Sequence, residues 1–368
     1  MTFFWYDSWM LKKYFQAKFK NSDISVYDFG NESYKKLQQL DKCFSNTLTE
    51  FRHDITNHIK HPFNIRTKRP YNYVNEPRSF SETCFAIAKN IVNLTDRPIA
   101  VYWSGGIDST VALVALMQTV DLKRLHVVCN QSSISEFSSF FHKKIKDRVR
   151  TITPMYAIEN YKDFFSVSGD GGDIIWGDIV DQQCWTLCHN KLQVNWQDHM
   201  IQHDITFIDF VEEFCSWSGV KIQSWFDLRV WFSMCCKYQE RVMRPYYLRQ
   251  GVTDIDAVSF YDVDSSLQNW TMSNLDGIVG QCWQDYKLAA KQFIFQYHND
   301  VDYLQTKTKE PSKALLPDLM NKSNLTSYRP IAVAENFSSP ALPSWPFLDY
   351  AEFEDFNDQH GLIPSDLL

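Results

Sequence analysis

The chain has 368 residues, of which 44% are hydrophobic and 22% are charged. These values indicate a globular protein with a substantial core, and an aromatic content of 15% argues against wholesale disorder. A formal net charge of −7 excludes a global positive field for binding nucleic acid. The longest purely apolar run, residues 111–117, is far shorter than the roughly 20 residues of a membrane-spanning helix. The N-terminus lacks a signal-peptide core, so we expect a cytoplasmic protein with no membrane partner.

Charge is distributed unevenly along the chain. Residues 1–80 contain 13 Lys and Arg against 8 Asp and Glu, whereas residues 331–368 contain 7 acidic residues and no Lys or Arg. Apolar spacing predicts a helix within 33–59, and a linker with three prolines follows at 61–77. We expect a small basic N-terminal region at 1–75, a main α/β domain at 76–320 and an acidic C-terminal extension at 321–368.

A glycine-rich turn follows the first predicted strand of the main domain. Residues 98–103 form a short apolar run that predicts a buried strand, and the residues from Asp108 onward predict a helix that is apolar nearly all round. The turn between them reads Ser104-Gly105-Gly106-Ile107-Asp108-Ser109.

A turn of this kind between a strand and a helix predicts a phosphate site. Glycines let the backbone approach the anion, and the free N–H groups and dipole of the helix start point at it. Hydroxyls of Ser104, Ser109 and Thr110 add donors. Asp108 would repel a phosphate, so its presence predicts a shared Mg²⁺. Neither the lysine of a Walker A loop nor a G-x-G-x-x-G pattern is present, which disfavours those two nucleotide folds.

The second parallel strand is predicted at 125–129. Residues 132–139 are expected to open the helix that follows, with Ser133 or Ser135 as its N-cap.

A second acid-bearing turn follows another strand, predicted at 164–167. It reads Ser168-Gly169-Asp170-Gly171-Gly172-Asp173. Turns at the carboxyl ends of parallel strands gather in one crevice. We therefore expect Asp108 and Asp173 to share Mg²⁺ around one pyrophosphate group, with Ser168 and Gly169 contributing to its binding.

The nine cysteines are an odd number, scattered through a long chain, and are expected to be reduced thiols. Cys184, Cys188 and His189 form the nearest approach to a metal-binding cluster. Their spacing suits one helical face, but a second ligand pair is missing, so buried thiols are favoured over zinc.

The string S-G-G-x-D-S at 104–109 resembles the PP-loop of the N-type ATP pyrophosphatases. Together with the second turn, it is similar to the asparagine synthetase branch of that group, whose second turn usually reads S-G-E-G-x-D-E-x-F-G-G. The resemblance covers roughly residues 80–315. It implies a doubly wound, mostly parallel α/β sheet with a helical C-terminal portion, and ATP and Mg²⁺ as cofactors.

The resemblance assigns roles to residues of the second turn. Asp173 falls on a metal-binding acid of the family, and Asp170 falls on its glutamate near the acyl-adenylate, with a side chain one methylene shorter. The chain departs from the pattern at two further positions, since Ile174 replaces a second acid and Asp178 replaces the last glycine.

Later segments extend the resemblance. Residues 240–243 and 260–262 echo two blocks of the branch, and residues 307–310 echo its R-Q-K-E stretch. The resemblance implies Lys309 as the catalytic lysine, Lys307 as a second phosphate ligand and Lys313 as the alternative to Lys309. In this group adenine packs near the carboxyl ends of the first two strands, which implies contact with Cys129 and Asn130.

The glutaminase domain of asparagine synthetases is not expected here, because residue 2 is Thr and the first 80 residues are too few. The predicted activity is that of an ATP-dependent C–N ligase that forms AMP and pyrophosphate. A small-molecule acyl substrate would be adenylated and attacked by an amine or by ammonia, either free or from a glutaminase partner.

Two other functions remain open from the sequence. The departures at Asp170, Ile174 and Asp178 are compatible with a non-catalytic nucleotide-binding scaffold. The basic first 80 residues are compatible with a PP-loop enzyme that modifies a nucleobase or nucleic acid, although the overall acidity does not favour it.

Overall fold

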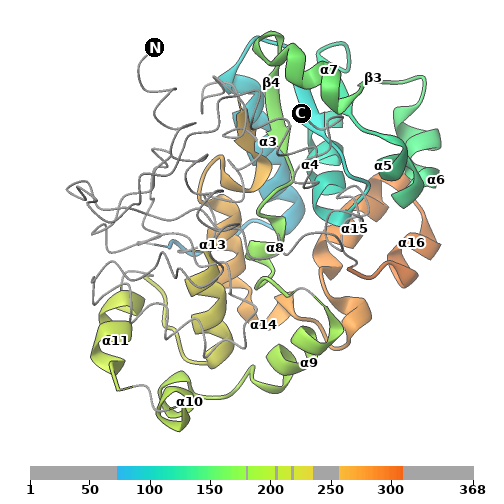
Figure 1. Cartoon of the computed structure of the whole chain (residues 1–368). Helices are drawn as coiled ribbons and strands as arrows, with labels where there is room; N and C mark the ends of the chain where they lie inside the picture. Colours follow the sequence, from blue (N-terminus) through green and yellow to red (C-terminus); the bar gives the residue numbers. More distant parts are fainter. Residues whose placement is uncertain (1–72, 180, 204–205, 217–218, 235–256, 310–368) are drawn as a thin grey trace, which may run out of the picture.

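The computed structural model describes residues 73–179, 181–203, 206–216, 219–234 and 257–309, and these residues include a parallel β-sheet (Figure 1). The sheet has five strands in the order β3-β2-β1-β4-β5, and every pairing is parallel. The strands are β1 (Ile99–Tyr102), β2 (Leu125–Val128), β3 (Arg150–Ile152), β4 (Phe165–Ser168) and β5 (Ala257–Ser259). The strands predicted at 98–103, 125–129 and 164–167 are confirmed as β1, β2 and β4.

The strand order brings the two glycine-rich turns to one edge of the sheet. From β1 the chain passes to β2 and β3 on one side, and then returns to place β4 on the other side of β1. The last residue of β1, Tyr102, is in register with Ser168, the last residue of β4. Because both strands run in the same direction, the turns after them start next to each other. In open α/β sheets such a reversal of strand order is where ligands bind.

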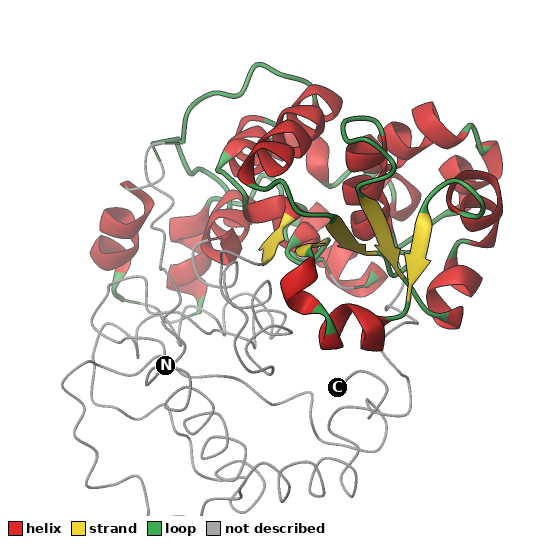
Figure 2. Cartoon of the chain, turned by 90° about the horizontal axis from the view of Figure 1, so that it is seen from above, coloured by secondary structure: helices red, strands yellow, loops and turns green. Residues whose placement is uncertain are grey.

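Helices surround the sheet (Figure 2). In the first half of the main domain they are α3 (Phe80–Leu94), α4 (Ile107–Met117), α5 (Gln131–Glu136), α6 (Ser138–Phe140), the π-helix η1 (Phe141–Ile145), α7 (Pro154–Glu159), the 3₁₀ helix η2 (Tyr161–Asp163) and α8 (Gly172–Ile175). The later elements are α9 (Gln182–Asn190), α10 (Trp196–Gln202), α11 (Ile208–Ser216), η3 (Phe260–Asp262), α13 (Ser266–Ser273), α14 (Leu275–Ile278), η4 (Trp283–Asp285), α15 (Leu288–His298) and α16 (Val301–Thr306). The described part of the chain therefore combines a parallel sheet with a mostly helical remainder.

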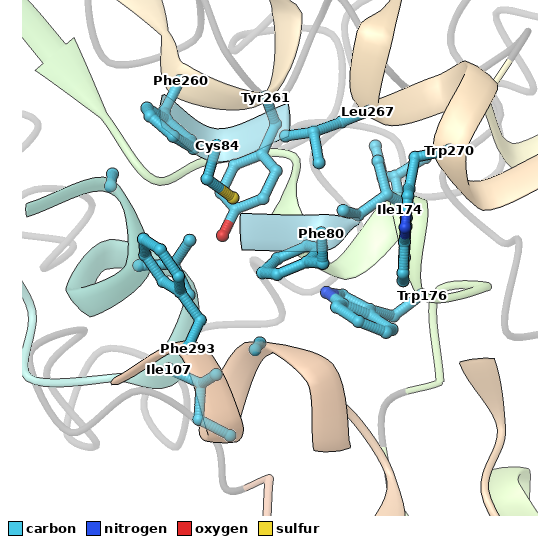
Figure 3. Packing of buried hydrophobic residues seen from close by; sticks show 14 of the residues in the cluster. Phe80, Cys84, Ile107, Ile174, Trp176, Phe260, Tyr261, Leu267, Trp270 and Phe293 are labelled. Atoms are coloured by element: carbon cyan, nitrogen blue, oxygen red, sulfur yellow. The ribbon is translucent and has the colours of Figure 1, made fainter. Parts of the chain in front are cut away.

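Helix α4 is the central helix of the core. Ten of its eleven residues are buried, because it packs between the sheet and the helices α3 and α15. Helix α3 begins with a capping box in which Ser79 and Glu82 bond to each other's backbone N–H groups. Its buried face places Phe80 among the rings of Trp176, Trp270 and Phe293 (Figure 3). These contacts hold α3 in place, and α3 in turn packs against α4, the helix that begins at the first glycine-rich turn.

The opposite face of the sheet carries a smaller apolar cluster. It includes Ala100 of β1 and Val128 of β2, together with Ala157 from α7 and the loop residue Phe164. Alternation of side chains along each strand separates this cluster from the main core.

Several expectations concern residues outside the described part of the chain. These are the helix within 33–59, most of the linker at 61–77, the block at 240–243, Lys313, and the basic and acidic terminal regions at 1–75 and 321–368. Among the described residues, no helix is both long enough and apolar enough to span a bilayer.

Candidate functional site

The first turn is held by hydrogen bonds among its own hydroxyl groups. Ser104 Oγ lies 2.9 Å from Ser109 Oγ, and the backbone N–H of Ser104 donates to Ser109 Oγ at 3.1 Å. The Thr110 hydroxyl donates to the carbonyl of Gly106 at 2.7 Å and accepts a bond from the indole N–H of Trp103. Thr110 is fully buried, so its hydroxyl stabilises the turn on the side that faces the core. Ser104 is half-buried and lies nearer the surface.

Gly105 allows the first turn to approach α5. Its φ of +81° lies in the left-handed region, which favours glycine. A β-carbon here would lie 2.4 Å from the carbonyl oxygen of Ser133 and 2.6 Å from Cβ of Glu136. The start of α4 therefore lies directly against the helix that follows β2.

The second glycine-rich turn packs closely against the first. A β-carbon on Gly169 would lie 2.6 Å from Cα of Ser109, and one on Gly172 would lie 2.4 Å from Cγ of Asp108. Gly171, with φ of +84°, is the N-cap of α8 and lets the chain turn into that helix. The glycines of the second turn thus leave room for the acid and the helix start of the first, and this brings Asp108 and Asp173 together.

A lysine that the sequence analysis did not single out links the two acids. Lys287 Nζ lies 2.6 Å from Oδ2 of Asp108 and 2.6 Å from Oδ1 of Asp173. Its side chain is 2% exposed, against 19% and 23% for the two aspartates. The ammonium is therefore enclosed by protein, and the two carboxylates form the side of the cluster that is open to solvent.

The backbone at Lys287 is unusual for its residue type. Its φ of +60° is left-handed, and it occupies the N-cap of α15, where its positive charge faces the positive end of the helix dipole. Both features are unfavourable for a lysine unless its side chain has strong partners. Both features are seen only in the structure, so the residues around Lys287 carry no local sequence signal of its role.

The predicted lysines of the 307–309 segment reach the same cluster. Lys309 forms an ion pair with Oδ2 of Asp173, and Lys307 forms one with Oε1 of Glu136. Since Glu136 packs against Gly105, Lys307 lies beside the first turn. The sequence analysis did not single out Glu136 either. The structure therefore brings Asp108, Asp173, Lys307 and Lys309 into one region.

Burial controls the ionisation of this cluster. Burial raises the pKa of Asp108, and the neighbouring Lys287 ammonium opposes that shift. For Lys287, burial disfavours the charged form, but the carboxylates of Asp108 and Asp173 outweigh it and raise the pKa above its usual value. Lys287 is thus an ammonium ion at any physiological pH, held by the two acids.

The donor set fits Mg²⁺ with phosphate ligands. The described residues contain no group of three or more His, Cys, Asp or Glu side chains placed to hold a metal alone. Mg²⁺ in nucleotide sites is held by one or two carboxylates together with phosphate oxygens and water. Asp108 and Asp173 provide two carboxylates, and Oδ1 of Asp108 is buried without a hydrogen-bond partner in the described structure. That oxygen is a suitable ligand for a cation.

The remaining predicted residues of the second turn lie at the same sheet edge. Ser168 is buried, and its Oγ accepts a bond from the N–H of Asp170. The Asp170 carbonyl accepts a 2.6 Å bond from Ser259 Oγ, which joins the turn to β5. Asp170 is half-buried beside the cluster, on the turn that also carries Asp173.

Two departures from the asparagine synthetase pattern are at fully buried positions. Ile174 is fully buried in the main core, where an acidic side chain would be costly. Asp178 is also fully buried, and its carbonyl accepts a bond from Arg229. Both residues therefore belong to the buried structure that follows the second turn.

The end of β2 differs in detail from the prediction. Cys129 follows β2 and is buried, and burial raises the pKa of its thiol to about 11, so it is neutral. The helix after it begins with Asn130 as N-cap, which corrects the expected Ser133 or Ser135. Ser133 instead closes a reciprocal capping box with Asn130, because its hydroxyl reaches back to the Asn130 N–H.

Cys184 and Cys188 lie on α9 and are buried, as their spacing on one helical face predicts. The Cys184 sulfur accepts a bond from the guanidinium of Arg229 at 3.5 Å. These thiols pack in the main hydrophobic core.

Comparisons with family models, with curated proteins and with solved structures found no match for this chain.

Proposed function

We propose that the protein is an ATP-dependent ligase that forms AMP and pyrophosphate, with its site between the two glycine-rich turns. In this proposal the sheet is that of the PP-loop ATP pyrophosphatases, and the acyl and amine substrates are small molecules. One observation carries the proposal: Asp108 and Asp173, from turns 65 residues apart in sequence, meet at one lysine at the point where the strand order reverses.

The arrangement suits a triphosphate. The N–H groups at the start of α4 and the positive end of its dipole face the edge of the sheet where the two turns lie. Lys287 and Lys309 contribute two positive charges, and Lys307 lies close by on the first turn's side. A phosphate chain carries several negative charges, which three ammonium groups and a helix start can balance. Asp108 and Asp173 would hold Mg²⁺, which supplies further neutralisation of phosphate charge when bound.

The proposed reaction has two steps. An oxygen of the substrate carboxylate attacks the α-phosphorus of ATP, the bond between that phosphorus and the bridging oxygen breaks, and pyrophosphate leaves. An amine then attacks the acyl carbon of the adenylate, loses a proton, and displaces AMP. The protein contributes by orienting the groups and stabilising the charge that develops on the pyrophosphate.

The experiment is a screen of carboxylates and amines for AMP and pyrophosphate formation from ATP with Mg²⁺. The variant Asp108→Asn should abolish turnover, because it removes a charge from the cluster while preserving shape. Asp96→Asn is the matched control, since Asp96 is exposed just before β1, at the opposite end of the strand from Asp108.

Three outcomes separate the hypotheses. Release of AMP and pyrophosphate that is lost in Asp108→Asn and retained in Asp96→Asn supports the ligase. Formation of ADP and phosphate contradicts the proposed reaction. Binding of ATP without AMP formation or ATP–pyrophosphate exchange, for every pair tested, favours a nucleotide-binding scaffold.

A further inference from the structure

A buried tyrosine hydroxyl next to the candidate site has no hydrogen-bond partner in the described structure. Tyr303 of α16 is 7% exposed, and its ring stacks on Phe137, with centroids 4.1 Å apart and planes at 9°. Its hydroxyl oxygen is buried and unbonded. A phenylalanine would make the same stack without burying a polar group, so packing alone does not account for the hydroxyl.

The surroundings of Tyr303 place it beside the first glycine-rich turn. Phe137, against which it stacks, directly follows Glu136, and Glu136 both pairs with Lys307 and packs against Gly105. Lys307 comes four residues after Tyr303 and caps the same short helix. Phe137 and Glu136, at the end of α5, therefore contact Tyr303 in α16 and Lys307 at its C-cap, beside the first turn.

The hydroxyl is a donor there. Burial raises the pKa of Tyr303 well above its usual value, and the charges of Asp108 and Glu136 raise it further. The phenol consequently keeps its proton at physiological pH. The Tyr303 ring stacks on Phe137, and the adjacent Glu136 packs against Gly105 of the first turn, so the side chain that carries this hydroxyl lies beside the proposed phosphate site.

We propose that Tyr303 is a nucleotide-binding residue whose hydroxyl donates a hydrogen bond to a phosphate oxygen of ATP held between the two turns. This inference rests on the proposed function, and it adds a phosphate contact from α16 to those from the turns and lysines. A charged phosphate oxygen is a strong acceptor for a neutral O–H group, and binding would satisfy a donor that folding leaves unpaired.

The test uses Tyr303→Phe in the full chain, with Tyr297→Phe as the matched control. Tyr297 is a partly buried tyrosine of α15 whose hydroxyl lies 3.9 Å from the sulfur of Met117. The probe is α,β-methylene-ATP with Mg²⁺, which resists cleavage between the α- and β-phosphates. Its Kd is measured by calorimetry, and the Tm is measured without nucleotide.

The expected result combines unchanged folding with weaker binding. Tyr303→Phe should keep or raise the Tm of the free protein, because it removes an unpaired buried hydroxyl. It should raise the Kd for the nucleotide by about tenfold or more, the effect of losing a hydrogen bond to a charged group. Inorganic pyrophosphate should show a similar loss, while binding of adenosine and the behaviour of Tyr297→Phe should not change.

Other results overturn the inference. An unchanged Kd in Tyr303→Phe, with weakened binding in Asp108→Asn, rejects Tyr303 while the nucleotide site stands. A marked fall in Tm without nucleotide shows that the hydroxyl serves folding instead. Equal losses for adenosine and pyrophosphate reject a phosphate contact. If the wild-type protein binds neither nucleotide nor pyrophosphate, both the inference and the proposed function fail.

Discussion

Gly172 lies so close to Asp108 that a β-carbon at position 172 would be 2.4 Å from the carboxyl carbon of the acid. Gly172 has no left-handed φ, so this closeness, and not backbone freedom, is what requires glycine there. The second turn is therefore shaped around the side chain of the first. Packing and the candidate chemistry depend on the same contact, which makes it a direct target for mutation.

Gly172→Ala should displace the Asp108 carboxylate. Overpacking of this kind costs about 1–3 kcal/mol of unfolding free energy. We also expect weaker Mg²⁺-dependent ATP binding, because Asp108 can no longer lie beside Asp173. Denaturant unfolding and calorimetric titration with ATP and Mg²⁺ measure the two effects.

Gly277→Ala is the control for that substitution. Gly277 lies in α14, and a β-carbon there would meet no atom within 4 Å. Alanine should be neutral or stabilise the helix by up to about 1 kcal/mol, with no effect on ATP binding. Equal binding losses in the two variants would show that the close contact at Gly172 is irrelevant to the site.

Lys287→Met should leave two neighbouring carboxylates without their shared ammonium. Removing one partner of a buried ion cluster costs about 3–5 kcal/mol. Mutual repulsion then raises the pKa of the acids above that of the unfolded chain, so the loss of stability is smallest at low pH and grows as pH rises. Unfolding by denaturant at pH 5 and pH 8 measures this difference.

Two further observations make the Lys287 prediction specific. Millimolar Mg²⁺ should restore part of the stability of Lys287→Met at pH 8, because the ion replaces the lost positive charge between the acids. Lys123→Met, at an exposed lysine, should show neither the pH effect nor the Mg²⁺ effect. A loss of stability in Lys287→Met that is the same at both pH values would contradict the ion cluster.

The strands β1, β2 and β4 and both turns could be predicted from the sequence because their signals are local, whereas the three-residue strands β3 and β5 were not predicted. Short apolar runs end at Ser104-Gly105-Gly106 and at Ser168-Gly169, and a parallel sheet then places their turns at one edge. The cluster of Asp108 with Asp173 followed from that placement, whereas the exact N-cap of α5 did not. Asn130 and Ser133 can both cap a helix, and only the geometry of the loop after β2 decides between them.

Lys287 and Tyr303 could not be found in the same way. Lys287 lies 179 residues after Asp108, and the segment around it carries no phosphate-binding pattern. Its role depends on the packing of α15 against α4, which is a tertiary contact. Tyr303 is spaced on α16 like an ordinary core residue, and only the lack of a partner for its hydroxyl distinguishes it.

The pair of Glu136 and Lys307 should be energetically coupled through its burial. Their side chains are 5% and 15% exposed. A double-mutant cycle with Glu136→Gln and Lys307→Met should give a coupling energy of about 0.5–3 kcal/mol in unfolding experiments. The pair of Glu76 and Arg78 is the comparison, since the Arg78 side chain is 40% exposed. Its coupling should stay below about 1 kcal/mol. Similar couplings for both pairs would argue against a special role for Glu136 at the first turn.

His126 should make the protein less stable in acid. It lies on β2, its ring contacts Phe164, and its Nδ1 is buried without a hydrogen-bond partner in the described structure. Burial lowers the pKa of the imidazole, which the backbone at Arg124 opposes and the charge of Arg150 reinforces. The folded protein thus keeps His126 neutral where the unfolded chain, with a pKa of about 6.5, already binds a proton. The free energy of unfolding should therefore fall as pH drops below about 6.5 and recover above it.

His126→Leu should remove part of this pH dependence, because leucine cannot bind a proton in the unfolded chain. The measurement is the change in unfolding free energy between pH 8 and pH 5.5, which should be smaller than in the wild type. The matched control is His142→Leu, at an exposed histidine of η1, and it should leave the pH dependence as it is in the wild type. His298 is also buried with a lowered pKa, so it contributes to the same pH dependence. The unfolding free energy of His126→Leu should therefore depend less on pH than that of the wild type, but should still depend on it. An unchanged slope would mean that His126 is already protonated in the folded protein, which its unbonded, buried Nδ1 argues against.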